Sequence, residues 1–388
     1  MMTILNDDHL IVRDQARKFA EREVVPIATE IDVNDTELPD SLLDKMAAMG
    51  WFGMTIPEAY GGVPFDTLTQ VLITEELARG MMSVGRVIHR NLMNGWILNK
   101  SGTEQQKKKY LPRIADGSLR TANGATEPEA GSDFANISTT AVKKGDRYLL
   151  NGVKQFITWS SQADMIFLYA KTDTKAQPKH RGISCFLVEK QRGGFDEPRM
   201  VGTRLPMAGY HGMHTWQIQL NDVEVPEENL LGGVEGKAMP QLMNGYEAGR
   251  IGAAATVLGV SQAALDAALG YALQRKAFDR TISKFQAIRF KLADMVTEIE
   301  AGRQMLYNVA EKFDRGETCD MECGMVKLYC SEVLLRHAWN ALYIHGGNGY
   351  CTEFPVNRYW RDSAVGCIGE GTSDIQREII ARRLLGER

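Results

Sequence analysis

One carboxylate near the end of the chain, Glu370, stands between two glycines in the stretch CIGEGTSDIQR, residues 367–377. Ser373 and Gln376 match the capping-box pattern, which predicts that a helix begins there. The positive end of that helix would favour the ionised carboxylate, and the flanking glycines would let a bulky molecule approach. The pattern fits a carboxylate held ready for a partner molecule, although a solvated glutamate in a C-terminal loop explains the same residues.

Two stretches in the middle of the chain could bind a flat polar molecule. TEPEAGSD, residues 126–133, offers hydroxyl groups and a glycine that leaves the backbone accessible. In the next segment, Phe156 and Thr158 share one face of a strand if the side chains alternate. That arrangement would suit stacking and a hydrogen bond to a heteroaromatic ring, whereas an ordinary loop and simple core packing are the alternative explanations.

The second half of the chain adds charged and glycine-rich candidates. Glu247 and Arg250 stand three residues apart, and HGGNGY, residues 345–350, could bring backbone N–H groups close to a phosphate. A surface ion pair and a helix C-cap explain these two patterns equally well. Solvated helix ends are likewise the alternative for a possible clamp on an anionic aromatic ligand, made of Arg275, Phe278 and Gln286.

The whole chain has an ordinary globular composition. It has 388 residues, 44% hydrophobic and 24% charged, with a net charge of −4, which argues against a nucleic-acid binder. The N-terminus MMTILNDDHL lacks a signal or transit pattern, and no apolar stretch looks long enough to span a membrane, so we expect a cytoplasmic protein. The six cysteines are scattered, form no CxxC pair and predict neither disulfides nor a metal site.

Hydrophobic periodicity divides the chain into three zones. Residues 1–118 have helical spacing, with Asp66 as one expected cap and a capping box at Thr103 and Gln106. Residues 119–230 alternate with period two and form a predicted β domain. Residues 231–388 return to long helical stretches, joined by short loops as in an antiparallel bundle; these stretches are 238–274, 285–315, 320–345 and 373–386.

Two turn signals fall inside the β zone. Asn151-Gly152 is a strong hairpin signal, and Asn221-Asp222 follows an alternating run. We therefore expect strands to end at both places.

The joint order of TEPEAGSD, FIT, RKAF…FQ, HGGNGY and EGTSDIQ resembles the acyl-CoA dehydrogenase family over essentially the full length. The resemblance implies an α+β multi-domain protein with an N-terminal helical domain, a middle β domain and a C-terminal antiparallel four-helix bundle. It also implies bound FAD and removal of two hydrogens across Cα–Cβ of an acyl-CoA thioester. In such a reaction Glu370 would take the α-proton while the β-hydride moves to flavin N5.

The resemblance assigns further roles by motif, some of them to a neighbouring subunit. Glu247, Arg250 and Gly371 would contact substrate, together with Ser132. The residues that would contact FAD are Asn123, Gly124, Ala125, Thr126, Gly131, Ser132, Phe156, Ile157, Thr158, Arg275, Phe278, Gln286, Tyr343, Gly346, Gly347, Thr372, Ser373 and Asp374.

The chain also departs from the family pattern. Gly369 stands where Tyr is frequent, Tyr343 where Gln is common, and Phe156 where Trp is frequent. One branch of the family carries its base on a helix at the position of Gly249, which cannot serve. Glu247 lies two residues away, about 200° round the helix, so Glu370 remains the candidate base. We expect burial against flavin and acyl chain to raise its pKa and the helix N-terminus to oppose that rise.

The resemblance further implies an electron-transfer flavoprotein as partner and a homo-oligomer, usually a dimer of dimers. Related activities stay open: an enoyl-CoA reductase, a dehydrogenase of polar, dicarboxylic or carrier-protein-bound thioesters, or a non-catalytic flavoprotein.

The stretch SVGRVIHRNLMNGWIL, residues 83–98, aligns with the wall of the acyl pocket. Arg86, His89 and Arg90 share one helical face there. A solvated face or a structural ion pair explains them. Alternatively, Arg86 or Arg90 recognises an anionic acyl tail, because the arginine fork matches a carboxylate.

Overall fold

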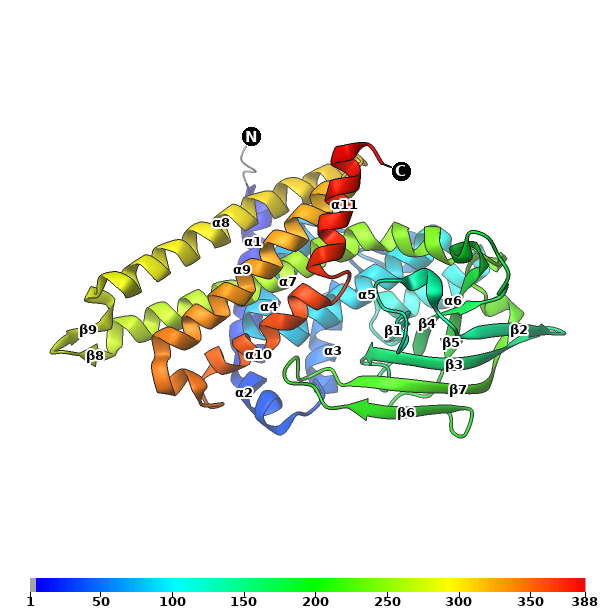
Figure 1. The fold of residues 1–388 in the computed structure, drawn as a ribbon, viewed down its shortest axis with the longest axis horizontal. Coiled ribbons are helices and arrows are strands. Elements are labelled where there is room, and N and C mark those ends of the chain that lie inside the picture. The colour runs from blue at the N-terminus through cyan, green and yellow to red at the C-terminus, as the bar shows by residue number, and fades with distance from the viewer. Residues whose placement is uncertain (1–4, 388) are drawn as a thin grey trace.

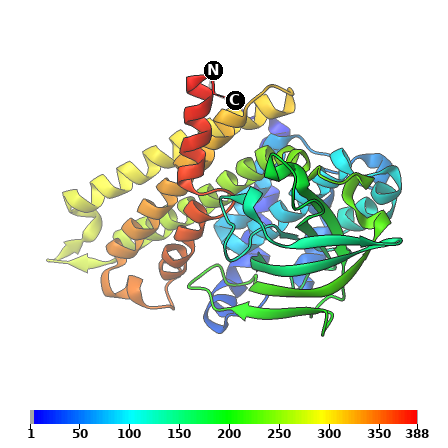
Figure 2. The same ribbon diagram turned by 45° about the vertical axis from the view of Figure 1, so that its right-hand side comes forward.

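The computed structural model describes residues 5–387, in the order helical, β, helical that the periodicity predicts. Figures 1 and 2 both show the sheet beside the helical bundle. The first helical part contains α1 (Asp7–Phe19), a π-helical turn (Ala20–Val24), α2 (Val25–Asn34), α3 (Asp40–Ala48), α4 (Thr67–Gly80), α5 (Met82–Ser101) and α6 (Glu104–Ala115).

The caps predicted for two of these helices are confirmed. The Asp66 carboxylate accepts from the Thr69 backbone N–H at 2.7 Å and caps α4. Thr103 and Gln106 form the reciprocal capping box at the start of α6. Both caps satisfy backbone donors that the first turn of a helix leaves without partners.

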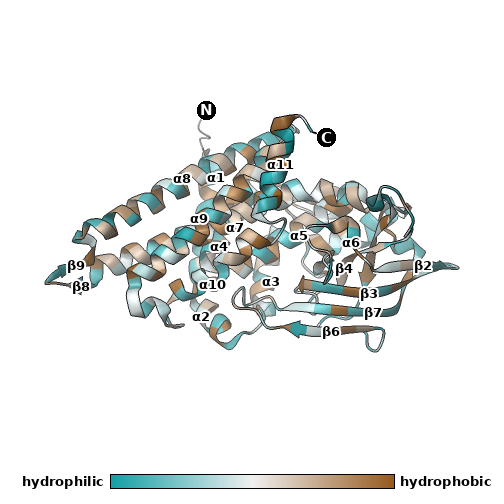
Figure 3. Cartoon of the chain, viewed as in Figure 1, coloured by the Kyte–Doolittle hydropathy of each residue, from teal (hydrophilic) through white to brown (hydrophobic). Residues whose placement is uncertain are grey.

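The middle part is a seven-stranded sheet in the order β1-β4-β2-β3-β7-β6, with β5 paired to β4. β1 runs parallel to β4, whereas β3 lies antiparallel to both β2 and β7. Figure 3 shows both hydrophobic and hydrophilic residues along β3. The strands are β1 (Thr121–Gly124), β2 (Thr140–Lys144), β3 (Arg147–Thr158), β4 (Met165–Lys171), β5 (Ile183–Glu189), β6 (Met200–Leu205) and β7 (Thr215–Pro226).

The two turns predicted inside this zone are wrong. Asn151 lies within β3 and Asp222 within β7, and the register shifts between Leu150 and Gly152. The Asn151 amide donates to the Asp222 carboxylate at 2.8 Å and accepts from the Asp222 backbone N–H at 2.9 Å. Residues that tolerate left-handed backbone thus build a bulge across two strands rather than two turns.

The last part is the predicted helical bundle. α7 (Ala238–Gln274), α8 (Gln286–Asp314), α9 (Asp320–His345) and α11 (Ser373–Leu385) match the predicted stretches closely. α10 (Pro355–Ile368) was missed, because its start at a proline after CTEF has the composition of a loop. A two-stranded hairpin, β8 (Lys276–Ala277) and β9 (Arg280–Thr281), joins α7 to α8 at the end of the bundle opposite the sheet (Figure 1).

The expectation that no apolar stretch reaches the length of a membrane span is wrong for α7. This helix is long and apolar enough by length and composition, with a mean hydropathy of 1.3 in its most apolar window. Within the fold, 78% of that window is buried. Its apolar character therefore matches a helix at the centre of the bundle.

A buried ion pair joins strand β3 to the loop that follows β1. Lys154 on β3 donates to the Glu127 carboxylate at 2.8 Å, and both side chains are almost fully buried. Burial opposes ionisation of Glu127, yet the Lys154 charge and a backbone donor at Ser138 hold its pKa at about 2. The same ammonium donates to the Ala125 carbonyl at 3.3 Å, so the pair fixes the loop that the family resemblance assigns to the flavin.

Replacing Glu127 by Gln should destabilise the protein, because Lys154 would be left buried without a counter-charge. A broken buried pair costs about 3–5 kcal/mol, whereas an exposed pair contributes about 1 kcal/mol or less. Urea unfolding should therefore show a large fall in midpoint for Glu127→Gln and little change for Glu104→Gln, which loses the surface pair with Lys107. Equal midpoints for the two variants would contradict this role of the buried pair.

Candidate active site

Glu370 lies in the tight turn between α10 and α11, with φ of +56°. The helix cap differs from the prediction: the Thr372 hydroxyl, not Ser373, accepts from the Ile375 backbone N–H. Gln376 does not complete a capping box, since its amide donates to the Gly371 carbonyl at 3.1 Å. A Cβ at Gly371 would lie 2.6 Å from that amide nitrogen, so glycine is required beside the carboxylate.

A buried lysine holds the same turn from the opposite side. Lys327 of α9 is 0% exposed, and its ammonium donates to the Gly371 carbonyl at 2.6 Å. Burial lowers the pKa of Lys327 to about 8. Sequence reasoning missed this residue because a lone lysine in a helix usually faces water; its apolar neighbours one turn away, Cys323 and Cys330, were the available signal.

Helix α5 brings two groups onto the Glu370 carboxylate. The Arg86 guanidinium donates to Oε1 at 2.7 Å, and His89 Nε2 lies 3.2 Å from Oε2. Arg86 is only 4% exposed, so the solvated-face interpretation is wrong for it, and the ion pair forms with the candidate base itself. Arg90, one residue further along, is half-buried, and its Nε has no hydrogen-bond partner.

In the ligand-free protein the Glu370 pKa is lowered, whereas the expected rise concerns the complex with flavin and acyl chain. Burial raises this pKa, but the positive charges of Arg86 and Arg90, together with the contact to the His89 ring, outweigh burial and lower it well below the usual range. The carboxylate is therefore held ionised in the ligand-free protein. This effect depends on residues about 280 positions away along the chain, which local sequence patterns do not reveal.

Two glycines of α7 let its backbone approach the pair. A Cβ at Gly249 would lie 3.9 Å from Glu370 Oε2, and one at Gly252 would lie 2.0 Å from His89 Nδ1. Arg250 is buried between them, with Nε and Nη1 unpartnered and its guanidinium over the Tyr246 ring. α7 thus adds another buried cation with unused donors to the site.

Glu247, which the family resemblance assigned to substrate, is half-buried on the same helix. Burial raises its pKa, and the charges that act on it come from Asp320, Arg250 and Arg383. The charged groups around Glu247 therefore include Asp320 at the start of α9. No contact between Glu247 and Glu370 supports a direct role for Glu247 in the site.

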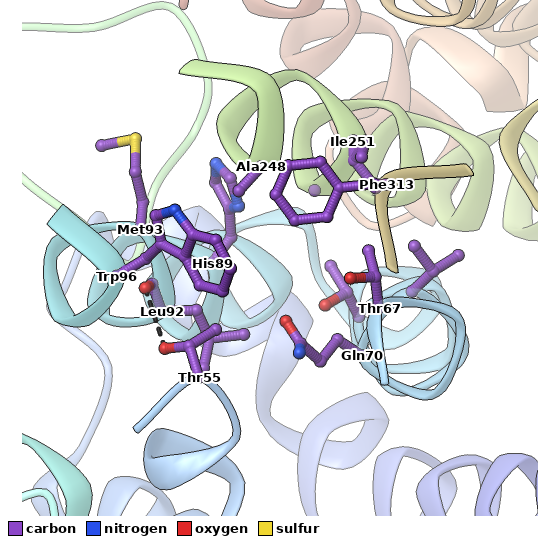
Figure 4. Close-up of a pocket in the computed structure, with 13 residues that line it drawn as sticks. Thr55, Thr67, Gln70, His89, Leu92, Met93, Trp96, Ala248, Ile251 and Phe313 are labelled. Atoms are coloured by element: carbon purple, nitrogen blue, oxygen red, sulfur yellow. Dashed lines mark hydrogen bonds between the residues drawn. The ribbon is translucent and has the colours of Figure 1, made fainter. Parts of the chain in front are cut away.

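A small cavity adjoins His89 between α4, α5 and α7 (Figure 4). Trp96 and Phe313 form an aromatic wall, with ring centroids 5.4 Å apart, and Thr55, Thr67 and Gln70 line another side. Sequence reasoning did not single out these residues. Trp96 lies in the stretch 83–98 that the resemblance aligns with the acyl pocket, but its ring was not named, and Phe313 comes from a distant segment without a motif.

One group of the predicted flavin residues gathers at the sheet edge next to α5. The Asn123 amide on β1 donates to Asn94 of α5 at 2.8 Å, and the Asn94 amide donates to Thr121 at 2.9 Å. Phe156 has φ of +59° and is 55% exposed, because a register shift interrupts β3 between Lys154 and Ile157. A bulge thus interrupts the regular alternation that was assumed for Phe156 and Thr158. Of residues 156–158, only Ile157 is buried.

The other group lies at the far end of the bundle, around the β8–β9 hairpin and the loop after α9 (Figure 1). Phe278 is 88% exposed there, and Tyr343 is also exposed. Within one described chain the two groups are therefore not brought together. The far group consists of Arg275, Phe278, Gln286, Tyr343, Gly346 and Gly347.

A methyl group at Gly252 should push His89 off Glu370 and destabilise the fold. Overpacking of this kind costs about 1–3 kcal/mol, so the unfolding midpoint of Gly252→Ala should fall, and Gly252→Ala combined with His89→Ser should recover it. Gly270→Ala on the same helix is the control, because a Cβ there meets nothing within 4 Å. If Gly252→Ala is as stable as Gly270→Ala, the close approach of α7 to His89 is wrong.

Comparison with known proteins gives a consistent picture. Models of the acyl-CoA dehydrogenase N-terminal, middle and C-terminal domains match residues 6–118, 122–223 and 236–385. The chain is similar to a (2S)-methylsuccinyl-CoA dehydrogenase of Cereibacter sphaeroides, with 39% identity over 98% of this chain and 70% of the relative. It is 41% identical to the CarC subunit of the caffeyl-CoA reductase-Etf complex of Acetobacterium woodii, over 98% of this chain and 99% of that one. A glutaryl-coenzyme A dehydrogenase in complex with glutaryl-CoA superposes with a TM-score of 0.94 and 34% identity, covering 100% of this chain and 98% of that one.

Proposed function

Because the chain belongs to the acyl-CoA dehydrogenase family of oxidoreductases, we propose that it acts on a short acyl-CoA whose far end carries a carboxylate. Glu370 is the base that takes the α-proton, and Arg86 binds the far carboxylate. The observation that carries this proposal is the 2.7 Å contact between Arg86 and Glu370, which puts a buried cation directly beside the reacting position.

The surplus of positive charge supports an anionic substrate. Arg86, His89, Arg90 and Lys327 all act on the single Glu370 carboxylate or its turn, and Nε of both Arg86 and Arg90 lacks a partner. Buried cations are stable only when they are paired, so a second anion would complete the site. A plain alkyl chain would leave these donors unused.

The geometry also limits the length of the substrate. The base must approach the α-carbon, and Arg86 lies in contact with that base. A carboxylate that reaches Arg86 must therefore be only a few carbon–carbon bonds of roughly 1.5 Å from the α-carbon. Short diacids such as succinyl- or glutaryl-type thioesters meet this limit. The names of two relatives, a methylsuccinyl-CoA and a glutaryl-CoA dehydrogenase, agree with that class.

FAD fits the residues at the sheet edge. Phe156 offers an exposed ring, the Asn123 carbonyl oxygen is buried without a partner, and a Cβ at Gly131 would meet only open space. These residues, with Thr126, Ser132 and Thr158, would hold the flavin beside α5. Bound FAD supplies the acceptor for the β-hydride. The chain itself positions the thioester, excludes water by burial and holds the α-proton on Glu370.

The far group of flavin residues supports an oligomer. An aromatic side chain as exposed as Phe278 suits contact with a second copy of the chain, and Leu273 and Phe290 on the adjoining helices are exposed as well. We propose that Arg275, Gln286 and the 343–347 loop complete the FAD site of a neighbouring subunit in a homotetramer. An electron-transfer flavoprotein is the proposed electron acceptor, in line with the Etf complex named for one relative. A cytoplasmic location stays a prediction.

An enoyl-CoA reductase is the second candidate. The aromatic wall of Trp96 and Phe313 in the adjoining cavity could hold an aryl group, and one relative is part of a caffeyl-CoA reductase. The same Glu370 would then give a proton to the α-carbon. Including an arylpropanoyl-CoA among the tested substrates separates this candidate from the diacid.

Glu370→Gln should keep bound FAD and acyl-CoA but lose α-proton abstraction, because the shape of the side chain is preserved and the base is gone. General-base losses are on the order of 10²–10⁴-fold. Stopped-flow reduction of the bound flavin under anaerobic conditions measures this loss, and the flavin spectrum confirms that cofactor binding is intact. Near-normal reduction in the variant would assign the proton to another residue.

In a panel of butyryl-, octanoyl-, isovaleryl-, arylpropanoyl-, succinyl- and glutaryl-CoA, a short diacid should reduce the flavin with the highest kcat/KM. Its lead over butyryl-CoA should be about tenfold or more, since an unpaired buried polar group costs about 1–3 kcal/mol. Arg113→Ala removes an arginine outside the site, so this control variant should rank the substrates as the wild-type protein does. If butyryl- or octanoyl-CoA is best, the diacid assignment is wrong.

A further inference from the structure

Both oxygens of the Glu370 carboxylate are engaged before any substrate binds. Oε1 accepts from the Arg86 guanidinium at 2.7 Å, and Oε2 lies 3.2 Å from His89 Nε2. A carboxylate takes a proton from carbon through an oxygen lone pair, and a base paired with cations is a weaker base. In the ligand-free protein, Glu370 is therefore a weaker base than an unpaired carboxylate.

We propose that Arg86 is a latch on Glu370, which the carboxylate of the substrate releases by taking the guanidinium for itself. This rests on the proposed diacid substrate, and it makes Arg86 a specificity-determining residue that acts on proton abstraction rather than on binding alone. The α-proton moves from carbon to a Glu370 oxygen and leaves one negative charge on the thioester. Loss of the β-hydride then removes that charge.

The backbone around Glu370 is built to stay in place while its side chain moves. Lys327 and Gln376 both hold the Gly371 carbonyl, at 2.6 and 3.1 Å, and the Gly371 conformation leaves no room for another residue. Neither contact involves the Glu370 carboxylate. A change of side-chain rotamer is therefore enough to move the carboxylate away from Arg86.

Arg86 has the donors that such an exchange needs. Its guanidinium offers five N–H groups, and Nε is buried without a partner while Nη1 binds Glu370. A substrate carboxylate can therefore begin to bind before the contact with Glu370 is lost, and then form the two parallel bonds that arginine favours. A neutral acyl chain has no anionic group that could accept these hydrogen bonds, so Arg86 stays bound to Glu370.

Release of Arg86 changes the charge that Glu370 meets. The ionisable groups that interact with it are Arg86, His89 and Arg90 on α5, Lys327 on α9, Tyr246 on α7 and Tyr210 in the loop before β7. Arg250 on α7 and Cys367 on α10 act on Lys327. Arg86 makes the closest contact of these and contributes the largest favourable charge. Its neutralisation by a substrate carboxylate makes Glu370 a stronger base.

The test separates proton abstraction from flavin chemistry. Two thioesters with sulfur in place of the β-carbon cannot lose a hydride: a 3-thiaglutaryl-CoA and an uncharged 3-thiapentanoyl-CoA. Exchange of their α-hydrogens with D₂O, followed by mass spectrometry on the FAD-loaded oligomer, reports Glu370 alone. Arg86→Met removes the charge at similar volume, and Arg86→Lys keeps it as a control.

In the wild-type protein the diacid analogue should exchange at least about tenfold faster than the uncharged one. In Arg86→Met the uncharged analogue should gain about tenfold, with its pH profile moved to higher pH, while the diacid loses its lead. Arg86→Lys should keep the wild-type order.

A slower exchange of both analogues in Arg86→Met, or an unchanged rate for the uncharged one, would overturn the latch and leave Arg86 as a recognition group only. The proposed function has a separate test: it is wrong if a neutral acyl-CoA reduces the flavin of the wild-type protein best. Even then, a gain by the uncharged analogue in Arg86→Met would show that Arg86 restrains Glu370, but its release by a substrate carboxylate would be wrong.

Discussion

The site depends on one electrostatic constraint: a single half-buried carboxylate, Glu370, is surrounded by several basic side chains. Arg86 and His89 contact its two oxygens, and Lys327 binds the carbonyl of the next residue. Burying ions is costly unless they are paired, so this arrangement is stable only because the carboxylate is fully ionised. The same basic side chains explain why an anionic substrate would be accepted and why the pKa of Glu370 is lowered.

The fold makes this cluster possible by bringing distant segments to one point. Helix α5 of the first helical part carries Arg86 and His89, α9 carries Lys327, and the turn before α11 carries Glu370. α7 approaches His89 closely because Gly252 has no side chain. β1 is fixed to α5 through Asn94, so the sheet edge with Asn123 is held next to the same cluster.

Local patterns in the sequence predicted what depends on local physics. The four long helical stretches, the Asp66 cap and the capping box at Thr103 are confirmed. The turns expected at Asn151 and Asn221 are wrong, because residues that tolerate left-handed backbone pair across two strands. The lowered Glu370 pKa of the ligand-free protein was not foreseen, because the decisive partner, Arg86, lies 284 residues away in sequence. Contacts between separate elements leave no local pattern, so Lys327 and the pairing of Trp96 with Phe313 were also missed.

The most direct measurement is a crystal structure of the FAD-loaded protein with 3-thiaglutaryl-CoA. We predict that the far carboxylate of this analogue is bound by Arg86, and that the Glu370 carboxylate has left the guanidinium and faces the α-carbon. A complex in which Arg86 still contacts Glu370 at its ligand-free distance of 2.7 Å, with the far carboxylate bound elsewhere, would contradict the assignment.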